Sequence, residues 1–310
     1  MIQDTVGGSG GERLLQSFSE AVTELAERVS PSVVSVGAGG RSGSGIVWSE
    51  EGIVVTASHV VGRSASLTVT LDGGRRTQAS LAGMDPYLDV AALRVDSEGL
   101  SSLARGTAEG VRVGQFVLAL ANATGDGVSA TSGIVTGARR SARGFWGVRV
   151  DDAVVTDVRL NPGYSGGPLV DSSGRLLGLN VAYFASRGVA VSVNSLEEAV
   201  ARLSKDGGVK RGHLGVVVEP IELPQELSRL PEIGQNEALL VRSVEPGSPA
   251  RDSGVALGDV ILSLGGMKAI DEYSLYRALR GDVVGRGVVL RILRAEKIAE
   301  LQVTPKEAET

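Results

Sequence analysis

The segment at residues 161–170 constrains the fold more than any other part of this chain. It reads Asn-Pro-Gly-Tyr-Ser-Gly-Gly-Pro-Leu-Val, with a single serine among three glycines. Gly166 and Gly167 leave room for another backbone to pass close to Ser165, because glycine has no side chain. Gly163 can adopt backbone angles that aim the N–H groups of residues 163 and 165 at one point. Such donors stabilise a carbonyl oxygen that becomes negative, by about 3–4 kcal/mol each.

A serine hydroxyl is a poor nucleophile unless a base lies beside it, and this chain offers few bases. Its two histidines are His59 and His213, and it has no cysteine. His59 follows a run of β-branched residues, and Asp89 stands at the mouth of another apolar run. A buried aspartate usually needs a partner, and a histidine N–H is a suitable one. The order His59, Asp89, Ser165 matches the chymotrypsin order rather than that of subtilisin or the α/β-hydrolases.

The same residues carry a family resemblance. Thr56-Ala57-Ser58-His59 resembles the Thr-Ala-Ala-His of trypsin-like proteases, and residues 163–168 resemble their Gly-Asp-Ser-Gly-Gly-Pro. The match to the HtrA (DegP-like) family is closer, since Thr156-Asp157 precedes the Asn-Pro-Gly-x-Ser-Gly-Gly-Pro of residues 161–168. Residues 113–119 and 131–135 are also similar to HtrA segments. The resemblance runs from about residue 32 into the C-terminal region.

Each motif also has a purely structural interpretation. A glycine-rich turn can be only a turn, a histidine after a strand can be structural, and Asp89 alone can cap a strand end. Their combination in one order favours a catalytic triad of His59, Asp89 and Ser165. The alternative of another class is a catalytically weak or inactive peptide-binding scaffold that retains the fold.

Composition excludes several classes of protein. The 310 residues include 31 basic and 36 acidic side chains, a net charge of −5, which argues against a nucleic-acid surface. With 43 glycines and only 4% aromatic residues, short strands and tight turns are favoured over a helical bundle. Without cysteine, and with two distant histidines, we expect neither thiol chemistry nor a zinc site, and no cofactor.

The sequence also bears on location. No apolar run reaches the ~18–20 residues of a membrane span, and the first residues lack the features of a signal peptide. We therefore expect a soluble protein, either cytoplasmic or trimmed of a leader. The HtrA resemblance implies the cell envelope.

The fold is predicted to be mainly β, with a chymotrypsin-like double β-barrel followed by an α+β PDZ domain. An N-terminal extension at 1–31 contains an amphipathic helix at 12–29, which either packs on its own domain or forms an assembly contact. HtrA proteases form trimers through this segment, often using aromatic residues, and Phe18 is the only aromatic residue in it. A protease domain spans 32–205, a linker 206–211, a PDZ domain 212–305 and a polar tail 306–310.

Short strands are expected throughout the protease domain. The first barrel would use residues 32–36, 45–48, 53–56, 67–71, 78–81 and 91–95, with a hairpin turn at Asp72-Gly73-Gly74. The second would use residues 116–120, 133–138, 148–150, 153–156, 168–170, 176–180 and 189–193. The resemblance implies that the active site lies between the barrels. Ser195 and Glu198 fit a capping box that opens a closing helix ending near residue 204.

The PDZ signal follows the linker. Residues 213–216, His-Leu-Gly-Val, resemble the carboxylate-binding loop of a PDZ domain, and residues 245–250 and 254–262 resemble HtrA PDZ signatures. Leu275, Ala278 and Leu279 mark a short helix, and residues 288–293 a strand. Such a domain binds an extended C-terminal peptide as an added strand. The loop would comprise His213, Leu214, Gly215 and Val216, with His213 expected to be a neutral bystander.

The resemblance also predicts the remaining site residues. The oxyanion hole would comprise Gly163, Tyr164 and Ser165, with the donors from residues 163 and 165. A small, largely apolar substrate pocket would have the walls Leu160, Asn161, Asn180, Val181, Ala182, Val189, Ala190 and Val191. Arg159 occupies the position where trypsin-like enzymes read the substrate, and we expect it to point outward because an unpaired buried charge is costly.

Tyr164 departs from the family, which usually has asparagine there. Either it packs on a neighbouring loop and leaves the turn active, which we favour, or it biases the peptide before it toward a poorly formed oxyanion hole. The predicted activity is that of an HtrA-type serine endopeptidase that cleaves unfolded or exposed polypeptides in protein quality control and the stress response. Its expected partners are such polypeptides, C-terminal peptides at the PDZ domain, and copies of itself.

Overall fold

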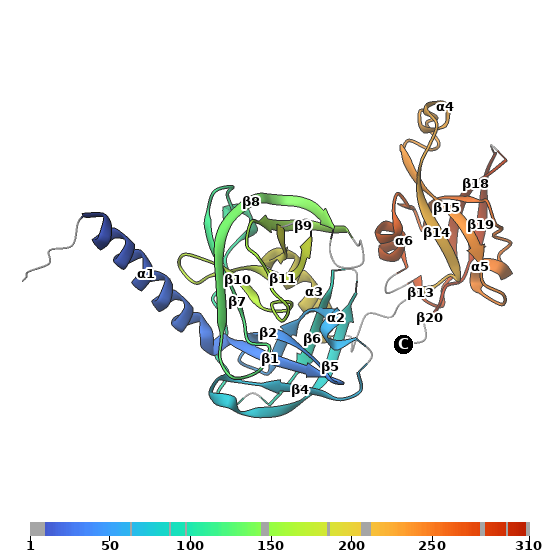
Figure 1. Cartoon of the computed structure of the whole chain (residues 1–310). Helices are drawn as coiled ribbons and strands as arrows, with labels where there is room; N and C mark the ends of the chain where they lie inside the picture. The colour runs from blue at the N-terminus through green and yellow to red at the C-terminus, as the bar shows by residue number, and fades with distance from the viewer. Residues whose placement is uncertain are drawn as a thin grey trace, which may run out of the picture. The chain divides into compact units, whose positions relative to one another are not determined.

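The computed structural model describes residues 10–62, 64–86, 88–96, 98–143, 149–184, 187–205, 212–279, 283–295 and 297–307 (Figure 1). The chain divides into two compact units, Met1–Gly208 and Val209–Thr310. The predicted linker at 206–211 lies outside the described residues. No helix in the described ranges is long and apolar enough to cross a bilayer.

Helix α1, Gly10–Val29, begins the first unit close to where apolar periodicity predicts it. Leu25 and Val29 are buried against the second barrel, in a cluster with Leu118 and Leu120. The Phe18 ring meets the Phe116 ring edge-on, with centroids 5.7 Å apart. Farther toward the N-terminus the helix runs away from the barrels (Figure 1). Its packing on its own domain therefore runs from Phe18 to Val29, among the described residues.

Two closed six-stranded barrels confirm the double-barrel prediction. The first follows the order β1-β2-β3-β6-β5-β4 and the second the order β10-β11-β12-β9-β8-β7. The first barrel consists of β1 Val33–Ala38, β2 Arg41–Ser49, β3 Ile53–Thr56, β4 Leu67–Thr70, β5 Arg76–Asp85 and β6 Val90–Arg94. The second consists of β7 Phe116–Ala121, β8 Ser129–Arg143, β9 Arg149–Thr156, β10 Pro168–Asp171, β11 Leu176–Phe184 and β12 Arg187–Ser192. The short helical turns η1 Ser30–Ser32, η2 Asp72–Gly74 and η3 Ala108–Gly110 connect these elements.

Local signals account for most of these strands. The predicted hairpin turn is confirmed, since β4 and β5 pair antiparallel around η2 and Gly73 has a φ of 74°. The predicted strands at 148–150 and 153–156 form one strand, β9, because residues 149–156 continue the same ladder. Helix α2, Ser58–Val61, was not predicted, because Val60 and Val61 resume the β-branched character of the strand before it. His59 therefore lies on a helical turn after β3 rather than at a strand end.

The capping-box prediction is wrong. Helix α3, Val193–Lys205, begins two residues before Ser195. The Ser195 N–H donates to the Ser192 hydroxyl at 3.3 Å, so Ser192 serves as the cap. The Ser192 hydroxyl donates in turn to Asp152 at 2.6 Å, which anchors the start of the helix to β9. A sequence pattern cannot show that contact, since forty residues separate its partners.

The second unit is an antiparallel sheet in the order β14-β15-β16-β18-β19, with β17 paired to β16. Strand β14 lies at one edge of the sheet, and α6 lies beside it (Figure 1). The predicted polar tail begins instead as strand β20, whose Lys306 pairs with His213. The strands are β13 Gly212–His213, β14 Val216–Glu222, β15 Glu237–Val244, β16 Val260–Leu264, β17 Met267–Lys268, β18 Val288–Arg294, β19 Lys297–Val303 and β20 Lys306–Glu307. The helices are α4 Gln225–Ser228, α5 Pro249–Asp252 and α6 Glu272–Ala278.

Candidate functional site

The structure brings His59 and Asp89 into direct contact. His59 Nδ1 lies 2.6 Å from Asp89 Oδ2. Asp89 Oδ1 accepts two further hydrogen bonds, from the His59 backbone N–H at 2.9 Å and from the Ser58 hydroxyl at 2.8 Å. Because a carboxylate only accepts, this arrangement puts the ring proton on Nδ1 and leaves Nε2 as an acceptor. Asp89 therefore fixes both the tautomer and the orientation of the imidazole.

Backbone geometry holds Asp89 at this position. Its φ is +56°, a conformation that aspartate tolerates better than most residues. Its carbonyl accepts the Ser58 N–H at 3.1 Å, so backbone and side chain both bind the turn that carries His59. The side chain of Asp89 is 9% exposed and that of His59 is 22% exposed. The pair is thus shielded at the carboxylate and open at the ring.

Ser165 belongs to the second barrel but lies against the first. Its carbonyl accepts the Ser44 N–H of β2 at 3.0 Å. Gly166 has a φ of 87°, and a Cβ there would fall on the Ser44 carbonyl oxygen and lie 3.0 Å from the Ala57 nitrogen. The predicted close approach of another backbone therefore occurs, and that backbone is the one leading to His59. The Ser165 hydroxyl has no hydrogen bond to another described residue.

The predicted oxyanion donors are available. Neither the Gly163 N–H nor the Ser165 N–H donates a hydrogen bond to another described residue. Gly163 has a φ of 96°, which only glycine adopts without strain. The Tyr164 carbonyl accepts the Gly167 N–H at 3.0 Å, which sets the direction of the Ser165 N–H. These features support the oxyanion hole, which stays a prediction.

Tyr164 lies in the core of the second barrel rather than on a neighbouring loop. It is 5% exposed and packs in a cluster with Val135, Val158 and Leu169. Burial raises the pKa of its hydroxyl above the ordinary value. The Gly163 and Ser165 N–H groups beside it have no acceptor among the described residues. That the turn is active stays a prediction.

The residues of the predicted substrate pocket differ in how far they are buried. Arg159 is exposed, as expected, and so is Asn161. Leu160 is half-buried and packs on the barrel core, where its Cγ lies 3.5 Å from the position of a Cβ on Gly188. The side chains buried in the barrel are Asn180, Val181, Val189, Ala190 and Val191, and that of Ala182 lies outside the described part of the structure. The pocket as a whole stays a prediction.

Asn180 has a clear structural task. Its carbonyl accepts the Gly166 N–H at 2.7 Å, and its own N–H donates to the Gly167 carbonyl at 2.9 Å. Its side-chain amide donates to the Pro168 carbonyl at 3.0 Å. Strand β11 thereby holds the segment after Ser165 from the second-barrel side.

In the predicted carboxylate loop of the second unit, the backbone carbonyls have partners and two backbone donors have none among the described residues. The N–H groups of Leu214 and Gly215 donate no hydrogen bond to other described residues. The Leu214 carbonyl accepts the Ala250 N–H, and the Gly215 carbonyl accepts the Glu245 N–H. Gly215 has a φ of 75°. Leu214 is buried in a cluster with Leu275 and Ala278 of α6. The loop thus presents free donors at the start of the edge strand β14.

His213 lies in this second unit. Its Nε2 lies 2.9 Å from Glu245 Oε2, so it has a carboxylate partner where we expected a bystander. Both side chains are largely exposed, and their contact therefore contributes little stability.

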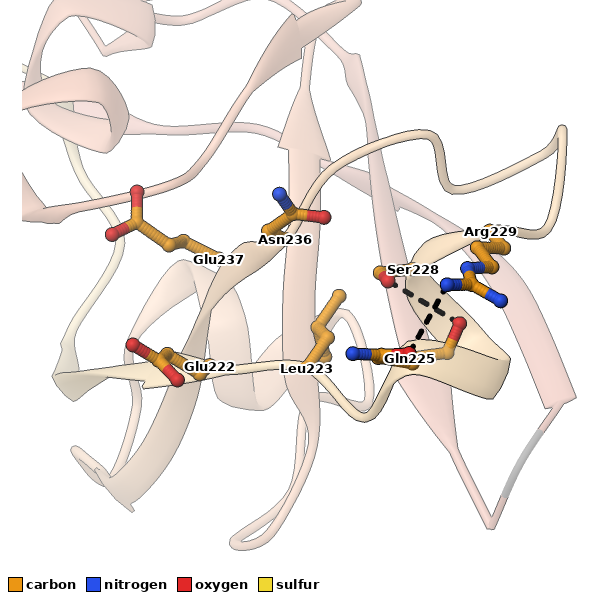
Figure 2. Close-up of a pocket in the computed structure, with 7 residues that line it drawn as sticks. All are labelled: Glu222, Leu223, Gln225, Ser228, Arg229, Asn236 and Glu237. Carbon is orange, nitrogen blue, oxygen red and sulfur yellow. Dashed lines mark hydrogen bonds between the residues drawn. The ribbon is translucent and has the colours of Figure 1, made fainter.

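A polar hollow lies at the other end of β14, where the chain passes into α4 (Figure 2). Glu222 and Glu237 face one another across β14 and β15, and Arg229 donates to Gln225 at 3.1 Å. Figure 2 shows the two carboxylates on one side and the Gln225–Arg229 pair on the other. Nothing in the sequence predicted this hollow.

Sequence reasoning missed two residues of the site, Ser58 and Ser44. Ser58 lies beside His59, but its hydrogen bond to Asp89 depends on a fold that brings residues 31 positions apart together. Ser44 stands between Gly43 and Gly45 in a strand, and isolated glycines in a strand are a signal of close backbone approach. That signal could have identified the place where the second barrel touches the first.

Comparison with known proteins agrees with this architecture. Residues 43–179 match the Trypsin-like peptidase domain family, and residues 212–304 match the PDZ domain family. A probable periplasmic serine endoprotease DegP-like of Halomonas elongata is 32% identical, with 96% of this chain and 64% of the relative covered. One from Brucella suis is 35% identical, with 84% and 52% covered. The chain thus spans about half to two thirds of the length of these relatives.

Solved structures extend the similarity across both units. An HtrA-type protease AlgW with tripeptide superimposes with a TM-score of 0.71 at 30% identity, covering 94% of this chain and 98% of that one. A serine endoprotease from Yersinia pestis superimposes with a TM-score of 0.69 at 26% identity, covering 92% and 98%. The two barrels, the PDZ fold that follows them and the extent of these matches lead to one conclusion: the chain belongs to the HtrA family.

Proposed function

We propose that this chain is a serine endopeptidase that uses Ser165, His59 and Asp89. The observation that carries the proposal is the contact of His59 Nδ1 with Asp89 Oδ2 at 2.6 Å. Ala57, two residues before His59, lies against Gly166, the residue that follows Ser165. Serine, histidine and aspartate in these roles form the triad of trypsin-like enzymes. The relatives named as serine endoproteases support the same reading.

The mechanism follows from the available protons and donors. Ser165 Oγ attacks the scissile carbonyl and forms a C–O bond, while His59 Nε2 takes the hydroxyl proton. Asp89 stabilises the imidazolium that results. The carbonyl oxygen becomes an oxyanion and accepts hydrogen bonds from the N–H groups of residues 163 and 165. His59 then gives its proton to the leaving amine, the C–N bond breaks, and water repeats the sequence on the acyl-enzyme.

The substrates that fit this proposal are unfolded or exposed polypeptides. An extended chain is needed to reach a site between two barrels, and the exposed position of Arg159 leaves no reason to expect a preference for acidic residues. The proposed residue before the cut is small and apolar, since the predicted pocket residues Leu160 and Ala190 are apolar, with Ala190 in the core cluster of the second barrel and Leu160 packed against it. The names of its relatives support a periplasmic location. The role proposed from the family resemblance is protein quality control and the stress response.

We propose that the second unit binds C-terminal peptides. The N–H groups of Leu214 and Gly215, which have no acceptor among the described residues, would donate hydrogen bonds to the terminal carboxylate, and the open edge of β14 would pair with the peptide backbone. Calorimetry on the full-length Ser165→Ala chain, which cannot cleave the peptide, tests this. We expect a peptide with an apolar last residue to bind and its C-terminal amide to bind at least tenfold more weakly. Equal affinities would contradict carboxylate capture.

We also propose that the chain forms a homo-oligomer, a trimer by family resemblance. Leu14, Leu15 and Phe18 on the N-terminal half of α1 are 73%, 71% and 55% exposed, an unusual apolar surface for a single chain. Sedimentation of Leu14→Glu/Leu15→Glu should show a smaller particle than the wild type, whereas Gln16→Lys on the same helix should not. A monomeric wild type would refute this assembly.

The endopeptidase proposal is tested by casein cleavage. Ser165→Ala and His59→Ala should each lower turnover by about 10⁶. Ser173→Ala, which removes an exposed hydroxyl of the same barrel, is the matched control and should leave turnover unchanged. The competing function, an inactive peptide-binding scaffold, predicts that the wild type itself cleaves no faster than Ser165→Ala.

A further inference from the structure

Ser44 of β2 connects the two barrels at the nucleophile segment. It is fully buried, at 0% exposure. Its N–H donates to the Ser165 carbonyl at 3.0 Å, and its hydroxyl donates to the Gly163 carbonyl at 2.7 Å. One residue of the first barrel therefore holds the carbonyls of both residues whose N–H groups serve as oxyanion donors.

The hydrogen bonds of Ser44 leave its hydroxyl no freedom to reorient. Its Oγ accepts the Asn122 N–H at 2.7 Å, from the loop after β7. Its carbonyl accepts the Thr56 hydroxyl at 2.6 Å. A serine hydroxyl has a single proton, and with Asn122 occupying the acceptor side that proton points at Gly163. The bond to the Gly163 carbonyl is thus directional and built into the contact between the barrels.

The peptides around Gly163 differ in how firmly they are held. The Gly163–Tyr164 peptide is held at both ends, by Ser44 at its carbonyl and by Asn161, whose carbonyl accepts the Tyr164 N–H at 3.1 Å. The Pro162–Gly163 peptide carries one oxyanion donor, but its carbonyl accepts no hydrogen bond from a described residue. Its orientation depends on its neighbour, because glycine at a φ of 96° resists rotation weakly.

We propose that Ser44 is a positioning residue of the oxyanion hole, whose hydroxyl fixes Gly163 so that its N–H stays aimed at the reacting oxygen. The proposal rests on the serine endopeptidase function proposed above and goes beyond it. Ser44 acts only through Gly163 and Ser165, so its loss should lower the rate of the chemical step without weakening substrate binding. The His59–Asp89 contacts do not involve Ser44 and should be unaffected.

The test measures steady-state cleavage of an internally quenched peptide by the full-length chain. For Ser44→Ala we expect kcat to fall by about 10-fold to 100-fold, less than the ~10²–10³ of losing an oxyanion donor outright. KM should stay within about twofold, and the pH midpoint of kcat should not move, because the base is intact. Labelling of Ser165 by a fluorophosphonate should slow in parallel.

Ser35→Ala is the matched control. The Ser35 hydroxyl also leaves the first barrel to bond a backbone carbonyl of the second, that of Ala123 at 3.0 Å, and Ser35 is 6% exposed. Its removal should lower the thermal midpoint but not kcat. Ser44→Cys replaces the hydroxyl oxygen by sulfur and keeps a weak donor, so its kcat should fall less than that of Ser44→Ala. If the alanine variant does not fold, the cysteine variant alone is compared with the wild type.

The outcomes separate the two proposals. An active wild type with an unchanged kcat in Ser44→Ala, or in Ser44→Cys where only that variant folds, overturns the role of Ser44. An equal loss of kcat in Ser35→Ala at a similar thermal midpoint overturns it as well, because general loosening would then explain the effect. A wild type that neither cleaves the peptide nor reacts with the fluorophosphonate contradicts the endopeptidase proposal itself.

Discussion

The contacts of Asp89 predict the result of replacing it by asparagine. Asp89 Oδ1 accepts the His59 backbone N–H, which can only donate. The oxygen of an asparagine must therefore occupy that position, and its NH₂ group must face His59 Nδ1. A donor at that place forces the ring proton to Nε2, the atom that has to accept the proton of Ser165. In Asp89→Asn the base is present and correctly placed, but it is in the wrong tautomer.

The magnitudes separate this effect from unfolding. Wrong-tautomer variants of trypsin-like enzymes lose about 10⁴ in kcat, which corresponds to about 5 kcal/mol of transition-state stabilisation. All three hydrogen bonds at the side chain survive in altered form, so we expect the free energy of unfolding to change by only about 1 kcal/mol. Asp89→Ala, by contrast, leaves the Ser58 hydroxyl and the His59 N–H without an acceptor, at a cost of about 1–3 kcal/mol each.

The assay combines kcat on a quenched peptide with urea unfolding of the same preparations. Asp157→Asn is the control, because Asp157 accepts the Ile134 N–H at 2.7 Å and an amide oxygen can do the same. We expect Asp157→Asn to behave as the wild type. If Asp89→Asn keeps more than about a tenth of the wild-type kcat while it remains folded, the tautomer argument is wrong.

Three further predictions follow from the same contacts. Tyr164→Phe should react with a fluorophosphonate at the wild-type rate. Because burial raises the pKa of the Tyr164 hydroxyl, the wild type should lose stability as the pH rises above about 10, and the variant should lose less. Urea unfolding at about pH 9 and about pH 11 measures both losses. Gly166→Ala should abolish labelling of Ser165, because a Cβ there meets the Ser44 carbonyl and the backbone has a φ of 87°; normal labelling would contradict the described contact between the barrels. Arg159→Gln should leave the cleavage preferences in a peptide library unchanged because Arg159 is exposed; loss of a preference for Asp or Glu would show that this side chain turns inward.

Much of the fold could be predicted because its signals are local. Short runs rich in Val, Ile, Leu and Thr identified most strands of the barrels, and Asp72-Gly73-Gly74 identified a turn whose angles suit glycine. The His59–Asp89 contact followed from chemistry, since a partly buried aspartate needs a donor. The prediction of where α3 begins failed because two serines, Ser192 and Ser195, lie within one turn. Only the contact of Ser192 with Asp152 decides which of them caps the helix.

The contacts between the barrels could not be predicted in the same way. The hydrogen bond from Ser44 to Gly163 joins residues 119 positions apart, and it depends on how two closed barrels meet. The position of Tyr164 inside the second barrel depends on the space left by its neighbours, which a pattern of residue types does not give. Family resemblance supplies the roles of such residues only where the residue types match, and at Tyr164 they do not.

The most direct test of the account is the rate at which a fluorophosphonate labels the folded wild-type chain, with the modified residue located by mass spectrometry. A triad assembled from both barrels predicts one label, on Ser165, formed at least 10³-fold faster than in the chain unfolded in urea, in line with the ~10⁶ that a triad contributes. His59→Ala should bring the rate down to that of the unfolded chain. Labelling of the folded wild type at the unfolded rate, or on a serine other than Ser165, would contradict the account.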